Sequence, residues 1–144
     1  MAPRRLIEII KNDDGFRAVM ERVFETAVEN AFDAIMITEA SPGYPIIYVN
    51  RAFTDLCGYP PEEILGQSPS VLQGPNTSRS VLEALQADLA AGRPFHGEAV
   101  NYRRDGSEFI MEWKIAPIRD EDGQIAFYIA IQRDVTELRH YRQL

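Results

Sequence analysis

The chain has 144 residues, of which 45% are hydrophobic, and its 22 acidic and 15 basic residues give a net charge of −7. This length predicts one domain with a single buried core. The negative charge disfavours nucleic acid and anionic membranes as partners, because both bind basic surfaces. No apolar run of the sequence approaches the roughly 20 residues that cross a bilayer, so we expect a cytoplasmic protein that does not act at a membrane.

Residues that build metal or catalytic sites are scarce. The single cysteine, Cys57, excludes an internal disulfide and a multi-cysteine zinc site, and we expect it to act as a small buried hydrophobe. The two histidines, His96 and His140, do not have the spacing of metal ligands. The acidic run at residues 120–122 precedes a glycine and is typical of a solvated turn. We therefore expect no metal site, no catalytic residues and no enzymatic turnover.

The first predicted element is an amphipathic helix within residues 1–30. Its apolar side chains recur three and four apart from Phe16 to Val28, which is the period of one helix face, and Asp13 or Asp14 can cap it. This apolar face has to be covered, either by a second copy of the chain in a dimer or by the sheet of its own subunit.

Two short strands and two short helices are predicted next. Ala34–Glu39 and Ile46–Asn50 are strand-like, and Asn50 is well placed to cap a helix over residues 51–59. A proline pair starts the second short helix, and Gly66 ends it.

The clearest helix covers residues 79–91, between three capping residues and a stop at Gly92. This spacing places one apolar face against the rest of the domain. Four side chains share the face: Val81, Leu82, Leu85 and Leu89.

Three long strands are predicted in the last third of the chain. Residues 94–104, 107–119 and 124–135 alternate between apolar and polar side chains, and Asp-Gly pairs between them favour tight hairpin turns. The polar residues 136–144 then begin a C-terminal connector helix, with Thr136 as its cap.

This order of elements predicts an α+β fold, in which a five-stranded antiparallel sheet carries helices on one face and flanking helices at both ends. We place the core domain at residues 31–135. The N-terminal helix of residues 1–30 precedes it, and the connector of residues 136–144 follows it.

Five segments stand out as a joint pattern: YVNRAFTDLCGYPPEEILG, LQGPNTS, AAGRPFHGEAVNYRRDGSEF, APIRDEDG and YIAIQRDVT. In this order, from about Val28 to Leu138, they resemble the PAS domain family and, within it, the LOV domains, which are flavin-binding blue-light sensors. The resemblance implies the PAS fold, an FMN cofactor between the helices and the sheet, and a sensory and regulatory role in signal transduction.

In LOV domains, the cysteine of the motif Gly-Arg-Asn-Cys-Arg-Phe-Leu-Gln-Gly forms a reversible adduct with the flavin under blue light. The matching residues 66–74 read GQSPSVLQG, so Pro69 stands in place of the photoactive cysteine. Proline has no thiol, and the adduct cannot form at this position. Ser68 as a cap and Pro69 as the first helical residue nevertheless preserve a helix start.

The resemblance also implies five cofactor-binding residues. Gln73, Asn101 and Gln132 match positions that hydrogen-bond the flavin, and Thr38 and Leu72 match positions that line its pocket. A buried amide without a partner costs about 1–3 kcal/mol, which favours a polar ligand beside Asn101 and Gln132. On the residues alone, these two could equally be exposed strand amides, and Gln73 could bond backbone in a loop.

Three matching positions lack the residue that the family has. The two arginines that clamp the phosphate fall at Ser70 and Gln86, and a second ring-binding asparagine falls at Met111. A phosphate without a guanidinium loses charge-assisted hydrogen bonds, and Arg79 lies two helical turns from Gln86, about 10 Å away. FMN is thus one of three outcomes, with riboflavin and no flavin as the alternatives.

Two functions follow from this pattern. In the first, a non-covalently bound flavin is photoreduced by an electron from Trp113, Tyr102 or Tyr128, and Gln132 turns its amide in response. In the second, the module binds another small ligand or none, and it serves dimerisation and signal relay. In both, we expect a homodimer through the flanking helices and an effector beyond Leu144, such as a histidine kinase or a diguanylate cyclase.

Overall fold

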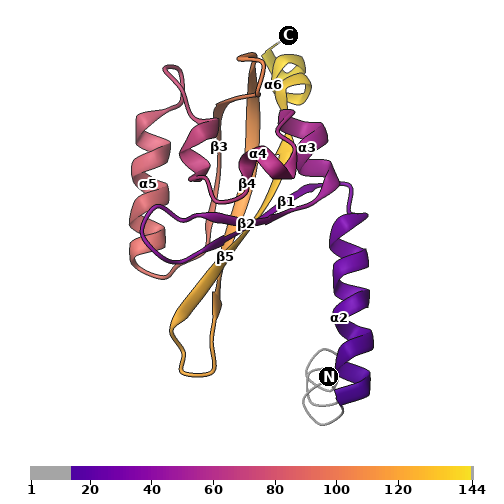
Figure 1. Cartoon of the computed structure of the whole chain (residues 1–144). Coiled ribbons are helices and arrows are strands. Elements are labelled where there is room, and N and C mark those ends of the chain that lie inside the picture. Colours follow the sequence, from indigo (N-terminus) through magenta and orange to yellow (C-terminus); the bar gives the residue numbers. More distant parts are fainter. Residues whose placement is uncertain (1–13, 144) are drawn as a thin grey trace.

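A computed structural model describes residues 14–143, with the side chains of residues 14–140 (Figure 1). The elements follow one another in the predicted order. They are helix α2 (Asp14–Glu29), strands β1 (Ala34–Glu39) and β2 (Ile46–Val49), helices α3 (Arg51–Cys57) and α4 (Pro61–Ile64), the 3₁₀ helix η1 (Pro69–Leu72), helix α5 (Arg79–Ala90), strands β3 (Phe95–Tyr102), β4 (Glu108–Arg119) and β5 (Ile125–Asp134), and helix α6 (Thr136–Gln143).

The strands form a five-stranded antiparallel sheet in the order β2-β1-β5-β4-β3. The last three strands make the predicted meander, because β4 pairs with both β3 and β5. The two hairpin turns contain Gly106 and Gly123 with φ of +87° and +79°, a conformation that glycine adopts at little cost. The prediction of an α+β fold with this sheet is confirmed.

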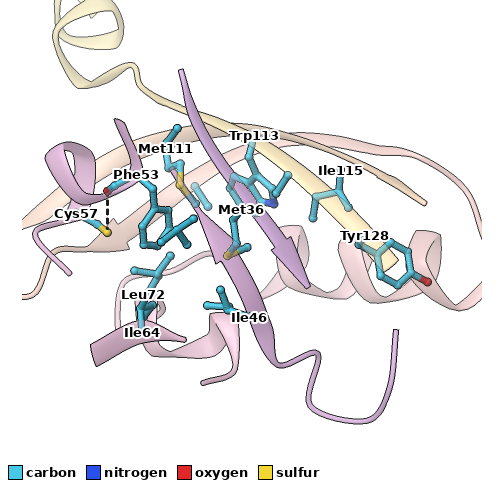
Figure 2. Close-up of a cluster of buried hydrophobic side chains, with 14 of the residues drawn as sticks. Met36, Ile46, Phe53, Cys57, Ile64, Leu72, Met111, Trp113, Ile115 and Tyr128 are labelled. Atoms are coloured by element: carbon cyan, nitrogen blue, oxygen red, sulfur yellow. Dashed lines mark hydrogen bonds between the residues drawn. The ribbon is translucent and has the colours of Figure 1, made fainter. Parts of the chain in front are cut away.

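The short helices and α5 cover one face of the sheet, which we call the inner face (Figure 1). Alternate side chains along each strand point to it, and Met111, Trp113 and Ile115 of β4 are buried there. Figure 2 shows the resulting core, which extends from Phe53 on α3 to Tyr128 on β5.

Asn50 joins four segments at the start of α3. Its Oδ1 accepts hydrogen bonds from the backbone N–H groups of Phe53 (3.0 Å) and Ile35 (2.8 Å), so it caps α3 as predicted and also anchors β1. Its Nδ2 donates to the carbonyl oxygens of Val28 (2.8 Å) and Asp33 (3.1 Å). Because the side chain is buried, the end of α2 and the entry into β1 are held from inside the core.

Helix α3 is shorter than the predicted helix over residues 51–59. It ends at Cys57, because Gly58 adopts φ of +82° and reverses the chain as a left-handed cap. Only glycine tolerates this conformation without strain, so the signal for the earlier end is present in the sequence.

Helix α5 begins as predicted after Ser78, whose Oγ accepts from the N–H of Val81 at 3.3 Å. Val81, Leu85 and Leu89 pack against the core. Leu82, the fourth residue of the predicted face, lines a hollow on the surface instead.

Thr136 does not cap α6, which corrects the sequence prediction. Its Oγ1 accepts from the N–H of Ile110 on β4 at 2.8 Å. The N–H of Thr136 donates to the carboxylate of Asp134 at 2.9 Å, so Asp134 satisfies the first donor of the helix. The threonine side chain therefore fastens α6 to the sheet.

Helix α2 extends away from the sheet (Figure 1). Asp14 is its first described residue, and the alternative cap Asp13 lies outside the described residues, as does the rest of the predicted helix before it. Val19, Val23 and Phe24 on its apolar face are 55%, 49% and 57% exposed, so the sheet of the same subunit does not cover them. Within residues 14–143, no helix has the length and apolarity needed to span a membrane.

Candidate ligand pocket

A cavity of about 180 Å³ lies between the helices and the inner face of the sheet. This volume is well above the roughly 30 Å³ that one water molecule occupies in liquid water. Residues of β1, η1, α5, β3, β4 and β5 line it, so segments far apart in the sequence meet there. Most of the wall is apolar or aromatic, through Met36, Tyr44, Leu72, Leu85, Leu89, Met111, Trp113, Ile115, Tyr128 and Ala130.

All five site residues expected from the sequence line this cavity. Thr38 lies on β1, Leu72 ends η1 and Gln73 follows it, while Asn101 lies on β3 and Gln132 on β5. Asn101 and Gln132 are only 3% and 2% exposed, so they are not the solvent-facing strand amides that the residues alone allowed. Gln73 is half-buried.

The amide oxygen of Gln132 lacks a hydrogen-bond partner. This Oε1 atom is buried, and no donor among the described residues reaches it. Asn101 lines the same cavity, and its Nδ2 donates a long bond of 3.3 Å to the carbonyl of Ala99 on its own strand. An unsatisfied buried polar atom costs about 1–3 kcal/mol. These two amides are therefore suited to hydrogen-bond a ligand in the cavity.

Three exposed residues, Tyr44, Ser70 and Gln86, mark the open side of the cavity. Tyr44 adopts φ of +50°, which is uncommon for a residue other than glycine. Its ring meets that of Tyr128 edge-on, with 5.8 Å between centroids, and the Tyr128 hydroxyl donates to the carbonyl of Leu89 at 3.2 Å. Burial raises the pKa of Tyr128, so its phenol stays a donor. The two rings connect the β1–β2 turn with α5.

The position of the missing cysteine lies on the cavity wall. Pro69 starts η1, and the Oγ of Ser68 accepts from the N–H of Ser70 at 3.2 Å, as the cap predicted from the sequence. Pro69 and Ser70 both line the cavity, and no cysteine does among the described residues. The wall therefore offers no thiol for a covalent bond to a ligand.

Cys57 is buried on α3 beside Phe53 (Figure 2), and it is not among the residues that line the cavity. Its Sγ donates to the carbonyl oxygen of Phe53 at 3.1 Å. Burial raises the pKa of the thiol to about 11, so it is protonated at neutral pH. These surroundings are those of a small hydrophobe and not of a reactive thiol.

The three aromatic residues named as electron donors lie in two places. Trp113 and Tyr128 line the cavity, whereas Tyr102 does not. The Tyr102 hydroxyl accepts from the N–H of Asn76 at 2.9 Å, and a Cβ added to Gly74 would lie 2.3 Å from the Tyr102 ring. Tyr102 thus holds the LQGPNTS segment against β3, which explains the glycine in that motif.

Sequence reasoning did not find the whole wall. The period of two along each strand is the signal for much of the rest, since Met36 precedes Thr38 by two residues and Ala130 precedes Gln132 by two. Tyr44 has no comparable signal, because it lies in a turn and reaches the cavity through an uncommon backbone conformation.

The strand that carries Gln132 continues into the C-terminal helix. β5 ends at Asp134, and α6 begins two residues later. Arg139 of α6 donates to the carboxylate of Glu98 on β3 through Nε, at 2.6 Å, and through Nη2. This ion pair and the Thr136 bond attach α6 to the sheet, close in sequence to the cavity.

Comparison with known proteins identifies relatives for most of the chain. The sequence profile of the PAS domain matches residues 33–137. A bacterioopsin transcriptional activator of Halobacterium salinarum is 38% identical over 117 residues, which are 81% of this chain and 17% of that protein. A blue-light-activated histidine kinase of Rhizobium johnstonii is 34% identical over 119 residues, which are 82% of this chain and 34% of that protein. The chain therefore spans a minor part of both relatives.

The fold has relatives among solved structures. A Light-Oxygen-Voltage domain studied with a flavin analogue superposes with a TM-score of 0.76 at 31% identity. The match covers 87% of this chain and 93% of that one.

Proposed function

Because this chain belongs to the PAS domain family and is similar to its LOV members, we propose that it is a sensory signal-transduction domain that binds a flavin non-covalently. The proposed cofactor-binding residues are the five that line the cavity: Thr38, Leu72, Gln73, Asn101 and Gln132. PAS and LOV domains are sensory modules, and we assign no catalytic residue to this chain. Any catalytic effector lies outside it.

The buried amide of Gln132 carries this proposal. Its oxygen has no partner among residues 14–143, and it shares the cavity with Asn101 inside a largely apolar and aromatic wall. Two amides in a cavity with such a wall complement a flat heteroaromatic ring with polar edge atoms. When bound, a flavin supplies absorption of blue light and reversible reduction. Pro69 has no thiol, so the residues of the wall hold the ligand without a covalent bond.

We propose that Gln132 responds to the redox state of the flavin. An amide offers either a donor or an acceptor to a neighbour, depending on its rotation. Gln132 precedes by two residues Asp134, whose carboxylate accepts from the first N–H of α6. A rotation of the amide would thereby alter the hydrogen bonds of β5 close to the point where this strand leads into α6. Of the three aromatic residues considered as electron donors, we propose Trp113 and Tyr128, because both line the cavity.

The colour of the purified chain tests the proposal. We expect a yellow protein, or one that becomes yellow with added FMN or riboflavin, and a change in the amide exchange of α6 on illumination. Gln132→Leu should abolish that change in the flavin-loaded protein. The control is Gln124→Leu, which removes an exposed amide in the turn between β4 and β5. A loaded Gln132→Leu protein that responds like the unaltered chain would contradict the role of Gln132.

The alternative is a LOV-like PAS module that binds another small ligand or none. Such a module would serve dimerisation and signal relay for a histidine kinase or a diguanylate cyclase. A colourless protein that takes up neither FMN nor riboflavin would leave this alternative standing.

We also propose a cytoplasmic homodimer that acts through its flanking helices on an effector beyond Leu144. The exposed residues Val19, Val23 and Phe24 on α2 support a dimer, since an apolar stripe on a helix usually has a partner. Light scattering should find a dimer for the unaltered chain and a monomer for Phe24→Glu. Arg22→Glu, on the opposite side of α2, is the control. An intact Phe24→Glu dimer would exclude this face as the main interface.

A further inference from the structure

We propose that the cavity selects a flavin that carries no phosphate, such as riboflavin, over FMN. This inference rests on the proposed function and specifies the chemical form of its ligand. The charge of the wall carries it: among the described residues that line the cavity, none is Asp, Glu, Lys, Arg or His.

The inner part of the cavity offers hydrogen bonds but no charge. Thr38, Asn101 and Gln132 are its polar side chains, and each is at most 4% exposed. A phosphate among them would lose its hydration without gaining a counter-charge, which is strongly unfavourable. The neutral ring atoms of a flavin do not carry this desolvation cost. A phosphate on the ligand would therefore have to lie at the open side, beside Ser70 and Gln86.

The η1 turn gives no cradle of backbone donors for an anion on that side. Pro69 has no N–H group. The N–H of Ser70 is bonded to the Oγ of Ser68 at 3.2 Å, and the N–H of Val71 to the Ser68 carbonyl at 3.2 Å. The Ser70 hydroxyl also donates to the Oγ of Ser68, at 3.0 Å. The donors of this turn are therefore engaged within the turn.

Helix α5 places no basic residue on the cavity wall either. Its basic residue, Arg79, lies seven residues before Gln86, about 10 Å along the axis. Arg79 does not line the cavity but an adjoining surface hollow, which shares Gln73 and Gln86 with it, and Glu83 lines the same hollow, so a carboxylate accompanies the guanidinium. A phosphate at the opening lacks charge-assisted hydrogen bonds and meets a protein of net charge −7.

A neutral polyol tail fits this opening better than a phosphate. The exposed Gln86 and the half-buried Gln73 provide amide groups that both donate and accept, and the oxygen of the exposed Ser70 hydroxyl can accept. Such groups match the hydroxyls of a riboflavin side chain without requiring a counter-ion. The amides of the inner part hold the same ring in riboflavin and in FMN. The difference in affinity between the two flavins therefore depends on the end of the side chain, where FMN carries its phosphate.

Calorimetric titration of the full chain with riboflavin and, separately, with FMN tests the selection. At low ionic strength we expect the dissociation constant for FMN to be about 3- to 10-fold larger, because the phosphate is repelled without being bound. Salt should narrow this ratio through screening. Tighter binding of FMN than of riboflavin would overturn the inference while leaving the proposed function intact. Failure to bind either flavin would overturn the proposed function itself.

Introducing cations at the opening should reverse the preference. Ser70→Arg combined with Gln86→Arg is expected to make FMN bind about tenfold or more tightly than riboflavin, through charge-assisted hydrogen bonds to the phosphate. Ser70→Gln combined with Gln86→Met changes size without charge and should keep the original ratio. Both replaced residues are exposed, and circular dichroism checks that each variant folds. A double arginine variant with an unchanged ratio would show that the tail does not lie at this opening.

Discussion

The two faces of the sheet differ in chemistry although their residues alternate along the same strands. The inner face holds Met111, Trp113 and Gln132, which are buried under the helices and line the cavity. The outer face holds Glu98 and Glu112, which lie opposite each other on β3 and β4. The inner face therefore supplies burial and the wall of the cavity, and the outer face supplies charge.

The charges of the outer face explain where α6 attaches. Like charges directly opposite each other in a sheet are destabilising, so the two glutamates need cations nearby. Arg139 of α6 pairs with Glu98, and Arg133 lies 4.0 Å from Glu112. The pair of opposed glutamates thus provides an attachment point for the C-terminal helix. Residues of one strand thus serve different ends, as on β3, where Asn101 lines the cavity and Glu98 attaches the helix.

The largest expected contrast is between two phenylalanines. Phe53 is fully buried on the helix side, and Phe53→Ala should lower the free energy of unfolding by about 3–5 kcal/mol. Phe127 on the outer face is 37% exposed, and Phe127→Ala should cost less than about 1 kcal/mol. Urea unfolding followed by circular dichroism measures both. Equal losses of unfolding free energy in the two variants would contradict the difference in burial between the inner and outer sides of the sheet.

Next in size is the effect of alkaline pH through Cys57, which belongs to the core on the inner side. Its thiol has a pKa of about 11 in the folded chain and 9.0 as an ordinary value, so the unfolded chain releases this proton first. The free energy of unfolding should hence be unaffected below pH 9 and fall above it, by about 1.4 kcal/mol per pH unit until pH 11. Cys57→Ala should lack this component. Parallel pH profiles of the two proteins would contradict the burial of the thiol.

A smaller effect, of opposite sign, is expected at Gln132. Replacing it with methionine of similar shape removes the unsatisfied oxygen, so Gln132→Met should stabilise the ligand-free chain by about 1–2 kcal/mol. The same change should weaken flavin binding, because the ligand loses its amide partner. Thermal unfolding without ligand and calorimetry with riboflavin measure the two effects. A destabilised ligand-free variant would mean that the amide serves the fold and not the ligand.

The smallest expected effect on stability is on the outer face. Arg139→Gln should leave the free energy of unfolding nearly unchanged, since partly exposed ion pairs contribute little. It should nevertheless increase hydrogen exchange in α6, because the helix loses its bond to Glu98. Arg104→Gln breaks a comparable pair with Glu63 away from α6 and should leave that exchange unchanged. If hydrogen exchange in α6 is unaltered in Arg139→Gln, the ion pair does not help to attach α6 to the sheet.

Features that depend on a few neighbouring residues were predictable from the sequence. The Asn50 cap, the Ser68–Pro69 helix start and the Asp-Gly turns each follow from the preference of one residue type for one local conformation. The polar cavity residues needed more than local pattern. Only the family resemblance places Asn101 and Gln132 in a pocket, because alternation alone cannot tell which face of a strand is buried.

Contacts between distant segments were not predictable. Thr136 has the sequence signature of a helix cap, but the fold brings the N–H of Ile110 to its hydroxyl, and that bond prevails. Arg139 and Glu98 are 41 residues apart, and only the register of β3 against β4 puts that carboxylate within reach. Such partners are selected by the assembled sheet and not by neighbouring residues.

The buried amide of Asn50 gives α2 the geometry of a lever. The helix has 16 residues and is therefore about 24 Å long, with its last turn held at Val28 and its other end extended away from the sheet (Figure 1). A rotation of about 5° around the held end would displace the other end by about 2 Å. Asn50 thus holds the pivot of α2 against β1, and a small movement of β1 beside the cavity would produce a larger displacement at the far end of the helix.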